Sequence, residues 1–436
     1  MLNPIIWNNL SIKEQAEKLQ RPLRKNDHAF KTQVQTIIDE VKYKGDIALR
    51  QFTSQYDRVD LTSFQVSPAE FEQAQEQIAP QTLDALNQAI NCLTHFHGPQ
   101  ILNAFSVETA PGVLCENQPR ALNKIGIYIP GGTAPLISSV LMLGVPSKIA
   151  GCQNRILCSP PDQQGNINPA ILMAAKLCNI TTIYKLGGAQ AIAAMAYGTE
   201  TIPKVDKIFG PGNAWVTQAK LLVAQDPNGA DYDLPAGPSE VMVIADENAN
   251  PEFIAADLLS QAEHGPDSQV FLVCTDENII DRVQCALSQQ IKLLPRAAIA
   301  LNALENSCSI LVETLMEAIA IANAYAPEHL ILQVTQPRVY MDAIHAAGSV
   351  FLGPWSPESA GDYASGTNHV LPTYGFAKTL SGLSVRDFMK TISFQELTRT
   401  GLTQLAPTIC ELARLESLDA HKNAVDIRLS TENDRE

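Results

Sequence analysis

Eight short runs of β-forming residues, separated by helical stretches, constrain the fold of this chain more than any other feature. They occur from about residue 124 onwards and begin at Ile125, Arg155, Thr181, Lys207, Glu240, Gln269, Leu330 and Ser349. Alternation of strands and helices is typical of a parallel sheet with helices on both faces. Eight strands predict two such sheets, so we expect an α/β fold.

Both ends of the chain have a helical pattern instead. Up to about residue 100, apolar positions recur at helical spacing, for example through residues 31–41 and 80–90. The residues after about 383 return to a helical pattern and end in a polar tail. We therefore expect helical extensions on either side of the sheets.

Length, charge and cysteine content narrow the classes of protein. A chain of 436 residues exceeds what one hydrophobic core usually organises, so two or three domains are expected. A net charge of −15 opposes nucleic acid or an anionic membrane surface as the main partner. The nine cysteines show no C-x-x-C spacing, and neither a secretion signal nor a long apolar stretch is present. These features predict a cytoplasmic protein that is not inserted in a membrane.

Glycine-rich loops follow several of the predicted strands, where doubly wound sheets bind their ligands. The loops lie at residues 129–135, 187–190, 210–215 and 234–239. Two of them open helices, whose free backbone N–H groups favour a phosphate. None is a dinucleotide fingerprint, because Trp215 stands where the pattern that starts at Gly210 needs a third glycine. The glycines are explained equally well by turns that need a positive φ as by phosphate binding.

One helix is predicted to carry metal-binding groups near its C-terminal end. It begins at Asn250-Pro251, a good N-cap and first position, and should end at Gly265. Asp257, Gln261 and His264 are spaced i, i+4 and i+7 and so share one stripe of its surface. A lone histidine at a helix C-terminus more often interacts with the helix dipole, so a metal site would need ligands from elsewhere in the chain.

Two further segments contain candidate catalytic groups. Glu328 and His329 precede a predicted strand, where neighbouring side chains face opposite ways, so we expect them to act on different atoms. A solvated loop pair is the alternative. Asp362 and His369 belong to a long loop with few apolar residues, which either serves a site or is a surface excursion. His369 could equally fix that loop by hydrogen bonding.

The C-terminal tail and the cysteines give weaker signals. Glu416 and His421 lie in a charged helical tail, where solvated side chains are the ordinary explanation. Cys115 and Cys152 are candidates for a thiohemiacetal with an aldehyde. Neither has a histidine or lysine nearby in sequence, and burial is the usual state of a free cysteine, so we assign no role to either.

Six motifs, in order, resemble histidinol dehydrogenases. They are Gly131-Gly-Thr-Ala-Pro, Leu186-Gly-Gly-Ala-Gln-Ala-Ile-Ala-Ala, Lys204-Val-Asp-Lys-Ile-Phe-Gly-Pro-Gly-Asn-Ala, Asp233-Leu-Pro-Ala-Gly-Pro-Ser-Glu, Leu258-Leu-Ser-Gln-Ala-Glu-His-Gly-Pro-Asp-Ser-Gln and Pro357-Glu-Ser-Ala-Gly-Asp-Tyr-Ala-Ser-Gly-Thr-Asn-His-Val-Leu-Pro-Thr. The resemblance runs from about residue 25 to Val425. Its main departure is a few extra residues near Pro161, which are expected to form a surface loop.

The resemblance implies a homodimeric zinc enzyme that oxidises L-histidinol through L-histidinal to L-histidine with two NAD, the last step of histidine biosynthesis. Glu328 and His329 would be its acid–base pair. The implied zinc ligands are Gln261, His264, Asp362 and His421. The implied NAD contacts are Tyr128, Gln190 and Asn213, and the implied substrate contacts are Ser239, Gln261, His264, His329, Asp362, Glu416 and His421.

The fold implied by the resemblance is two incomplete Rossmann-like units with helical extensions at both ends. Residues 1–25 would form the N-terminal helical extension. Residues 26–123 and 240–382 would form a first domain with the metal and catalytic residues, around an inserted NAD-binding domain at residues 124–239. Residues 383–436 would form a helical dimerisation tail that carries Glu416 and His421 into the active site of the partner chain.

Two other functions fit the same residues. A zinc hydrolase could use the same ligands with Glu328 activating water and would need no dinucleotide. A catalytically silent homologue could keep the fold as a small-molecule binding protein. Formation of NADH from histidinol distinguishes the dehydrogenase from both.

Overall fold

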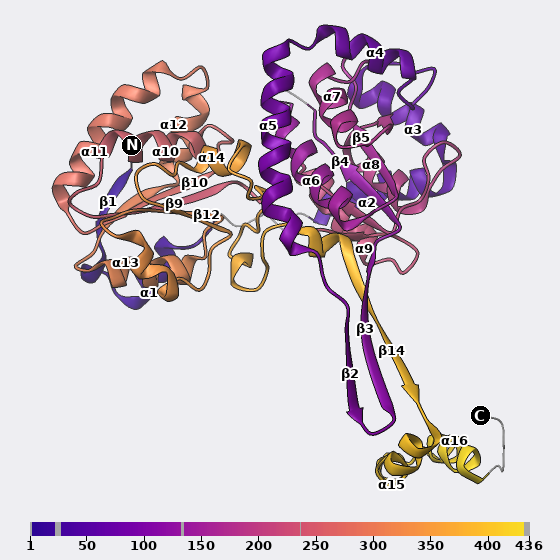
Figure 1. Cartoon of the computed structure of the whole chain (residues 1–436). Helices are drawn as coiled ribbons and strands as arrows, with labels where there is room; N and C mark the ends of the chain where they lie inside the picture. Colours follow the sequence, from indigo (N-terminus) through magenta and orange to yellow (C-terminus); the bar gives the residue numbers. More distant parts are fainter. Residues whose placement is uncertain (1, 22–27, 132–134, 236, 431–436) are drawn as a thin grey trace. The chain divides into compact units, whose positions relative to one another are not determined.

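The computed structural model describes residues 2–21, 28–131, 135–235 and 237–430 (Figure 1). Two compact units make up the chain. The first comprises Met1–Gln100 and Leu122–Asp387, and the second comprises Ile101–Ala121 and Phe388–Glu436. No helix among the described residues is long and apolar enough to span a membrane.

A six-stranded parallel sheet forms one half of the first unit, in the order β1-β11-β10-β9-β12-β13. The strands are β1 (Asn3–Ile6), β9 (Glu240–Ala245), β10 (Gln269–Cys274), β11 (Cys308–Leu311), β12 (His329–Gln333) and β13 (Ser349–Leu352). The central strands are apolar at most positions because helices cover both faces. One face packs on α10 (Pro251–Ala262), α11 (Glu277–Gln290) and α12 (Ala297–Glu305), and the other packs on α13 (Leu315–Tyr325).

A five-stranded parallel sheet forms the other half, in the order β6-β5-β4-β7-β8. Its strands are β4 (Lys124–Tyr128), β5 (Asn154–Ser159), β6 (Thr182–Lys185), β7 (Lys207–Phe209) and β8 (Asp231–Tyr232). Its helices are α6 (Ile137–Ala150), α7 (Pro169–Leu177), α8 (Gly188–Tyr197) and α9 (Ala214–Ala224).

The helices near the N-terminus pack on this second half. They are α2 (His28–Lys44), α3 (Asp46–Phe52), α4 (Pro68–Gln77) and α5 (Pro80–His97), while α1 (Ile12–Lys18) precedes them. α2 contacts α8 and α9, α4 contacts α7, and α5 contacts α6 (Figure 1). A shared core joins Val34 and Ile38 of α2 to Ile192 of α8.

The second unit contains an antiparallel sheet and two helices. The sheet order is β14-β3-β2, with strands β2 (Phe105–Ala110), β3 (Val113–Ala121) and β14 (Met389–Leu397). The helices α15 (Arg399–Leu415) and α16 (Asp419–Ser430) pack against each other. The strands come from two distant parts of the sequence, and Met389 pairs with Ala121.

The eight predicted strands are confirmed as β4, β5, β6, β7, β9, β10, β12 and β13, and the α/β fold with them. The prediction that both ends of the chain are purely helical is wrong. Residues 3–6 form β1 at the edge of the six-stranded sheet, and residues 389–397 form β14. β1 is only four residues long, and the polar–apolar alternation of β14 is confined to residues 391–395, directly before a longer helical pattern. Residues 22–25 of the predicted N-terminal extension lie outside the described residues.

The predicted pairing of residues 26–123 with residues 240–382 also differs from the structure. The helices of residues 28–97 share their core with the five-stranded sheet, and residues 105–121 belong to the second unit. An amphipathic helix shows in its sequence that it has a buried face, but not which sheet covers that face.

Candidate functional site

A cavity of about 170 Å³ in the first unit brings six predicted site residues together. These are Ser239, Gln261, His264, Glu328, His329 and Asp362. The cavity is also lined by Gly210 and Asp233, which follow β7 and β8 of the five-stranded sheet. Groups from both halves of the unit therefore line one cavity.

The catalytic candidates lie at the amino ends of strands, where a doubly wound sheet rarely carries its site. His329 is the first residue of β12, and Glu240 is the first residue of β9. Glu328 directly precedes β12, outside its regular alternation. This explains why Glu328 and His329 do not face opposite ways as expected: Oε2 of Glu328 lies 3.7 Å from Nδ1 of His329.

The backbone of Glu240 holds both side chains. Its N–H donates to Oε2 of Glu328 over 3.0 Å, and its carbonyl oxygen lies 3.1 Å from Nδ1 of His329. Nε2 of Gln261 is 3.2 Å from the same ring nitrogen. A carbonyl can only accept and an amide nitrogen can only donate, so only one of these two contacts can be a hydrogen bond to Nδ1. With a proton on Nδ1, that bond is the one to the Glu240 carbonyl. Nε2 of His329 is buried without a hydrogen-bond partner and is the nitrogen that can exchange a proton with a ligand.

Charges in the cavity shift both pKa values. Burial raises the pKa of Glu328 to about 7, against the attraction of His329. Burial lowers the pKa of His329, but the carboxylates of Glu328 and Asp362 outweigh it and raise this pKa to about 10. A carboxyl group with a pKa near neutrality suits general acid–base work.

Three potential metal ligands converge beside His329. One donor atom each from His264, Glu358 and Asp362 lies within 4.8 Å of the others. Oε1 of Gln261 is buried and has no hydrogen-bond partner among the described residues. An imidazole, carboxylates and an unsatisfied amide oxygen form a donor set that zinc accepts, so the residues present fit the metal. Three of the four predicted ligands are thereby brought together.

Glu358 is the group that sequence reasoning missed. It lies on α14 (Glu358–Tyr363), four residues before Asp362, and so on the same side of this short helix. That spacing was the available signal. Burial raises the pKa of Glu358 to about 8 despite the attraction of His329, and its Oε2 accepts a hydrogen bond from Oγ of Ser260 over 2.6 Å.

Asp362 is ionised, whereas the neighbouring Glu358 is neutral. Burial opposes its charge, but His329 outweighs burial and holds the pKa of Asp362 at about 2. Oδ1 of Asp362 lies 3.7 Å from Nε2 of His329. The cavity therefore offers one permanent negative charge directly beside the exchangeable nitrogen of His329.

His369 fixes the loop that contains Asp362 by hydrogen bonding, which was one of the two roles predicted for it. Its Nδ1 lies 3.0 Å from the backbone oxygen of Asp362, and its Nε2 lies 3.2 Å from Oγ of Ser139 on α6. The ring thus ties Asp362 to the other half of the unit.

Local sequence places the ligands of α10. Asn250 caps the helix by accepting from N–H of Glu252, and Pro251 occupies the first position, as predicted. The helix ends at Ala262 rather than at Gly265, and His264 lies in the turn that follows. Gln261 in the last turn and His264 just beyond it thus face the cavity from one end of α10.

The three candidate NAD contacts follow strands of the five-stranded sheet. Tyr128 ends β4, and its hydroxyl accepts from N–H of Gly188 over 3.0 Å. Gln190 is buried in the first turn of α8, after β6. Asn213 caps α9, after β7, by accepting from the backbone N–H groups of its first turn. The three candidates therefore lie at the carboxyl ends of strands, where a doubly wound sheet usually binds its ligand.

Gly210 explains one of the glycine-rich loops. Its φ is +119°, and an added Cβ would lie 2.0 Å from the backbone oxygen of Tyr128. Its N–H donates to Oδ2 of Asp233 over 2.6 Å, and Lys220 donates to both Asp233 and the Gly210 oxygen. Close approach of β4 and β7 requires glycine here. Residues 132–134 and 236 of two other loops lie outside the described residues.

A neighbouring cavity of about 850 Å³ joins cofactor and metal candidates. Asn213 lines it together with Ser239 and His264, and the latter two also line the smaller cavity. A dinucleotide bound at Asn213 would thus extend toward the metal-binding groups.

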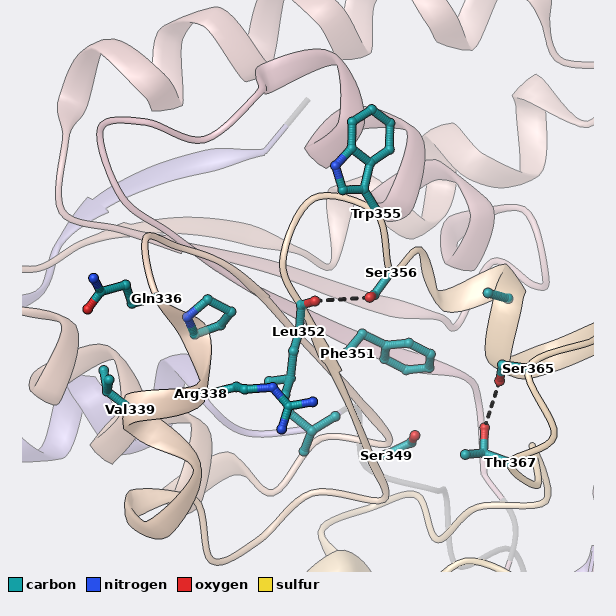
Figure 2. Close-up of a pocket in the computed structure, with 13 residues that line it drawn as sticks. Gln336, Arg338, Val339, Ser349, Phe351, Leu352, Trp355, Ser356, Ser365 and Thr367 are labelled. Atoms are coloured by element: carbon teal, nitrogen blue, oxygen red, sulfur yellow. Dashed lines mark hydrogen bonds between the residues drawn. The ribbon is translucent and has the colours of Figure 1, made fainter. Parts of the chain in front are cut away.

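A third cavity, of about 810 Å³, lies along β13 and is open to solvent (Figure 2). Phe351, Leu352, Trp355 and Arg338 line it, and Oγ of Ser356 donates to the Leu352 oxygen. None of the predicted site residues lines this cavity, so it is separate from the candidate site.

Glu416 and His421 belong to the second unit. Glu416 caps the C-terminus of α15 and His421 lies on α16, and both side chains are exposed. The unit with the cavity therefore contains neither of these two predicted contacts.

Comparison with known proteins identifies relatives over nearly the whole chain. A family model described as histidinol dehydrogenase matches residues 19–429. The histidinol dehydrogenase of Vibrio cholerae is 53% identical over 428 residues, which cover 98% of each chain. That of Salmonella typhimurium is 50% identical over 426 residues, covering 98% of this chain and 97% of the relative. A crystal structure of histidinol dehydrogenase from Elizabethkingia anophelis superposes with a TM-score of 0.94 at 49% identity, over 98% of each chain.

Proposed function

This chain belongs to the histidinol dehydrogenase family of oxidoreductases, and we propose that it oxidises L-histidinol through L-histidinal to L-histidine with zinc and two NAD, the last step of histidine biosynthesis. The observation that carries the proposal is the cavity in which Nε2 of His329 faces Asp362 and His264. It supplies a proton acceptor beside a cation site, which an alcohol dehydrogenase needs.

Zinc would be held by Gln261, His264 and Asp362, with His421 from a C-terminal tail. Support comes from the unsatisfied Oε1 of Gln261 and the converging donors of His264 and Asp362. Bound there, the metal would hold the imidazole and amine of the substrate and so orient its reacting carbon.

NAD would contact Tyr128, Gln190 and Asn213 and would accept the hydride. Asn213 and Ser239 line one cavity, which supports the contact at Asn213, whereas Tyr128 and Gln190 are buried and do not line that cavity. Ser239 and Glu416 would contact substrate together with the ligand residues.

His329 would act as the base in alcohol oxidation. The carboxylates of Glu328 and Asp362 raise its pKa to about 10, so the ring would become a base only where a bound cation offsets the charge of Asp362. With Nδ1–H held by the Glu240 carbonyl, Nε2 would then take the hydroxyl proton as the hydride leaves the carbon. Glu328 would take a proton from the water that adds to the aldehyde, because its pKa of about 7 lets it gain and lose a proton at neutral pH. His329 would take the remaining protons of the second oxidation.

A homodimer would complete the site, with the tail residues Glu416 and His421 entering the partner's cavity. Support comes from the many exposed apolar side chains of the second unit. They include Phe105 (60% exposed), Val107, Ile392, Phe394, Leu412, Leu415 (64%) and Ile427. A surface of this kind is favourable when a second copy covers it. The nine free cysteines support a reducing, cytoplasmic location.

Absorbance of NADH tests the function directly. Purified protein with zinc, NAD and histidinol should form two NADH for each histidinol consumed, and His329→Ala should form almost none. A zinc hydrolase or a silent binding protein would form no NADH. Absence of NADH with folded, zinc-loaded protein would overturn the proposal.

A further inference from the structure

We propose that Arg21 is a positioning residue for Glu328 and His329, because it holds the residue whose backbone binds both side chains. The inference rests on the proposed function, in which these two residues transfer the protons. It adds a group that does not line the cavity and lies between α1 and α2 in the sequence.

Arg21 forms a buried two-point ion pair with Glu240. Its Nε donates to Oε1 over 2.5 Å, and its Nη2 donates to Oε2 over 2.8 Å. The side chains are only 14% and 3% exposed. Oε1 also accepts from N–H of Tyr374 over 3.0 Å. The Glu240 carboxylate is therefore held from two sides, and paired guanidinium–carboxylate bonds fix orientation as well as distance.

The backbone of Glu240 in turn fixes the positions of the two catalytic side chains. Its N–H and carbonyl oxygen bond to Glu328 and His329, at 3.0 and 3.1 Å. The ladder between β9 and β12 begins one residue later, where Val241 pairs with His329. On this side, the Glu240 peptide is therefore outside the paired register and is held by the two catalytic side chains instead. A shift of Glu240 would displace both of them.

The same guanidinium also holds the segment that leads to Glu328. Nη2 of Arg21 donates to the backbone oxygens of Tyr325 (3.0 Å) and Ala326 (3.2 Å), and its Cζ lies 3.9 Å from the centroid of the Tyr325 ring. Ala326 is fully buried with φ of +56°, a conformation that L residues rarely adopt. Contacts from outside the segment must hold it there, and Arg21 supplies two of them.

Arg21 thus joins the start of β9 to the entry of β12, the two places that carry the acid–base pair. The candidate zinc ligands Gln261 and Asp362 lie on α10 and α14, and no hydrogen bond links Arg21 to them within the described residues. Loss of Arg21 should therefore impair proton transfer more than binding of metal or substrate.

The experiment compares Arg21→Gln and Arg21→Lys with the control Arg155→Gln. Arg155 is half-buried and donates to the backbone oxygens of Gly144, Cys178 and Asn179, away from the catalytic pair. We expect Arg21→Gln to lower kcat by about 10- to 100-fold in both oxidation steps, because small misplacements of catalytic groups have effects of this size. KM for histidinol and zinc content should stay within about 3-fold of the wild type.

Arg21→Lys should recover part of kcat, because it keeps the charge and loses the two-point geometry. It also keeps the test open if Arg21→Gln does not fold. The control should keep its kcat even where its thermal stability falls. Wild-type kcat in a folded Arg21 variant, or loss of zinc in parallel with loss of kcat, would overturn the positioning role. Absence of activity in the wild type would instead overturn the proposed function.

Discussion

Nδ1 of His329 lies 3.1 Å from the backbone carbonyl oxygen of Glu240, and this contact determines which ring nitrogen can exchange protons. The other nitrogen, Nε2, points at Asp362 without a hydrogen-bond partner among the described residues. A main-chain carbonyl cannot be protonated or turned away by a change of rotamer, so it fixes the ring more firmly than a side chain would.

Removal of the metal should abolish activity. A chelator should leave an inactive protein, and added zinc should restore NADH formation, because the converging donors would bind zinc tightly only together. His264→Ala should lower zinc content sharply by metal analysis. Full activity in verified metal-free protein would contradict the assignment.

The two oxidation steps should respond differently to changes of the acid–base pair. Glu328→Gln should slow oxidation of histidinal by about 100-fold or more and that of histidinol far less, because only the aldehyde step consumes water. His329→Ala should slow both steps. Each step can be measured separately by supplying histidinol or histidinal. Equal losses in both steps for Glu328→Gln would count against a water-activating role.

Neither candidate cysteine should be needed. Burial raises the pKa of Cys152 to about 11, so its thiol is not ionised at neutral pH and is a poor nucleophile. Changing both Cys115 and Cys152 to Ala should leave more than about half of kcat. A folded but inactive double variant, checked by circular dichroism, would revive a thiohemiacetal mechanism.

Asp257→Asn should make the protein more stable at neutral pH. Asp257 is 5% exposed, and burial raises its pKa to about 6 from an ordinary value of 3.8. The folded state therefore holds this proton more tightly, and stability falls as the pH rises from about 4 through 6. The free energy of unfolding of the variant should exceed that of the wild type by about 2 kcal/mol at pH 8 and by little at pH 4.

Urea unfolding at both pH values measures this gain. Asp246→Asn is the matched control, because Asp246 is equally buried but accepts hydrogen bonds from N–H of Asn248 and of Thr335. That variant should lose stability at pH 8. A wild-type pH profile retained by Asp257→Asn would refute the assigned cause.

Exchange of the C-terminal tails can be tested by mixing two inactive variants. If His421 serves the partner's site, a heterodimer of His329→Ala and His421→Ala chains contains one site with both defects and one with neither. Random pairing after unfolding and refolding should then restore about a quarter of the wild-type sites. No recovered activity, with heterodimers shown to be present, would place His421 in the site of its own chain.

Local sequence was sufficient for the features that depend on near neighbours. The apolar runs of β4 and β9 identify buried parallel strands, because helices on both faces leave no room for polar side chains. The cap of α10 at Asn250 and Pro251 was readable for a similar reason, since it satisfies backbone groups one turn away. The motifs also placed six site residues that the cavity brings together.

Tertiary structure alone decided which distant groups meet. Glu358 and Asp362 share one side of α14, but they meet His264 only because α14 packs on α10, and the sequence does not record that contact. The exposed strand β14 pairs with β3, which lies more than 250 residues earlier, and nothing in its own sequence identifies that partner. Arg21 reaches Glu240 in the same way. Local periodicity records that a side chain or strand is buried or exposed, whereas its partner is chosen by the packing of whole elements.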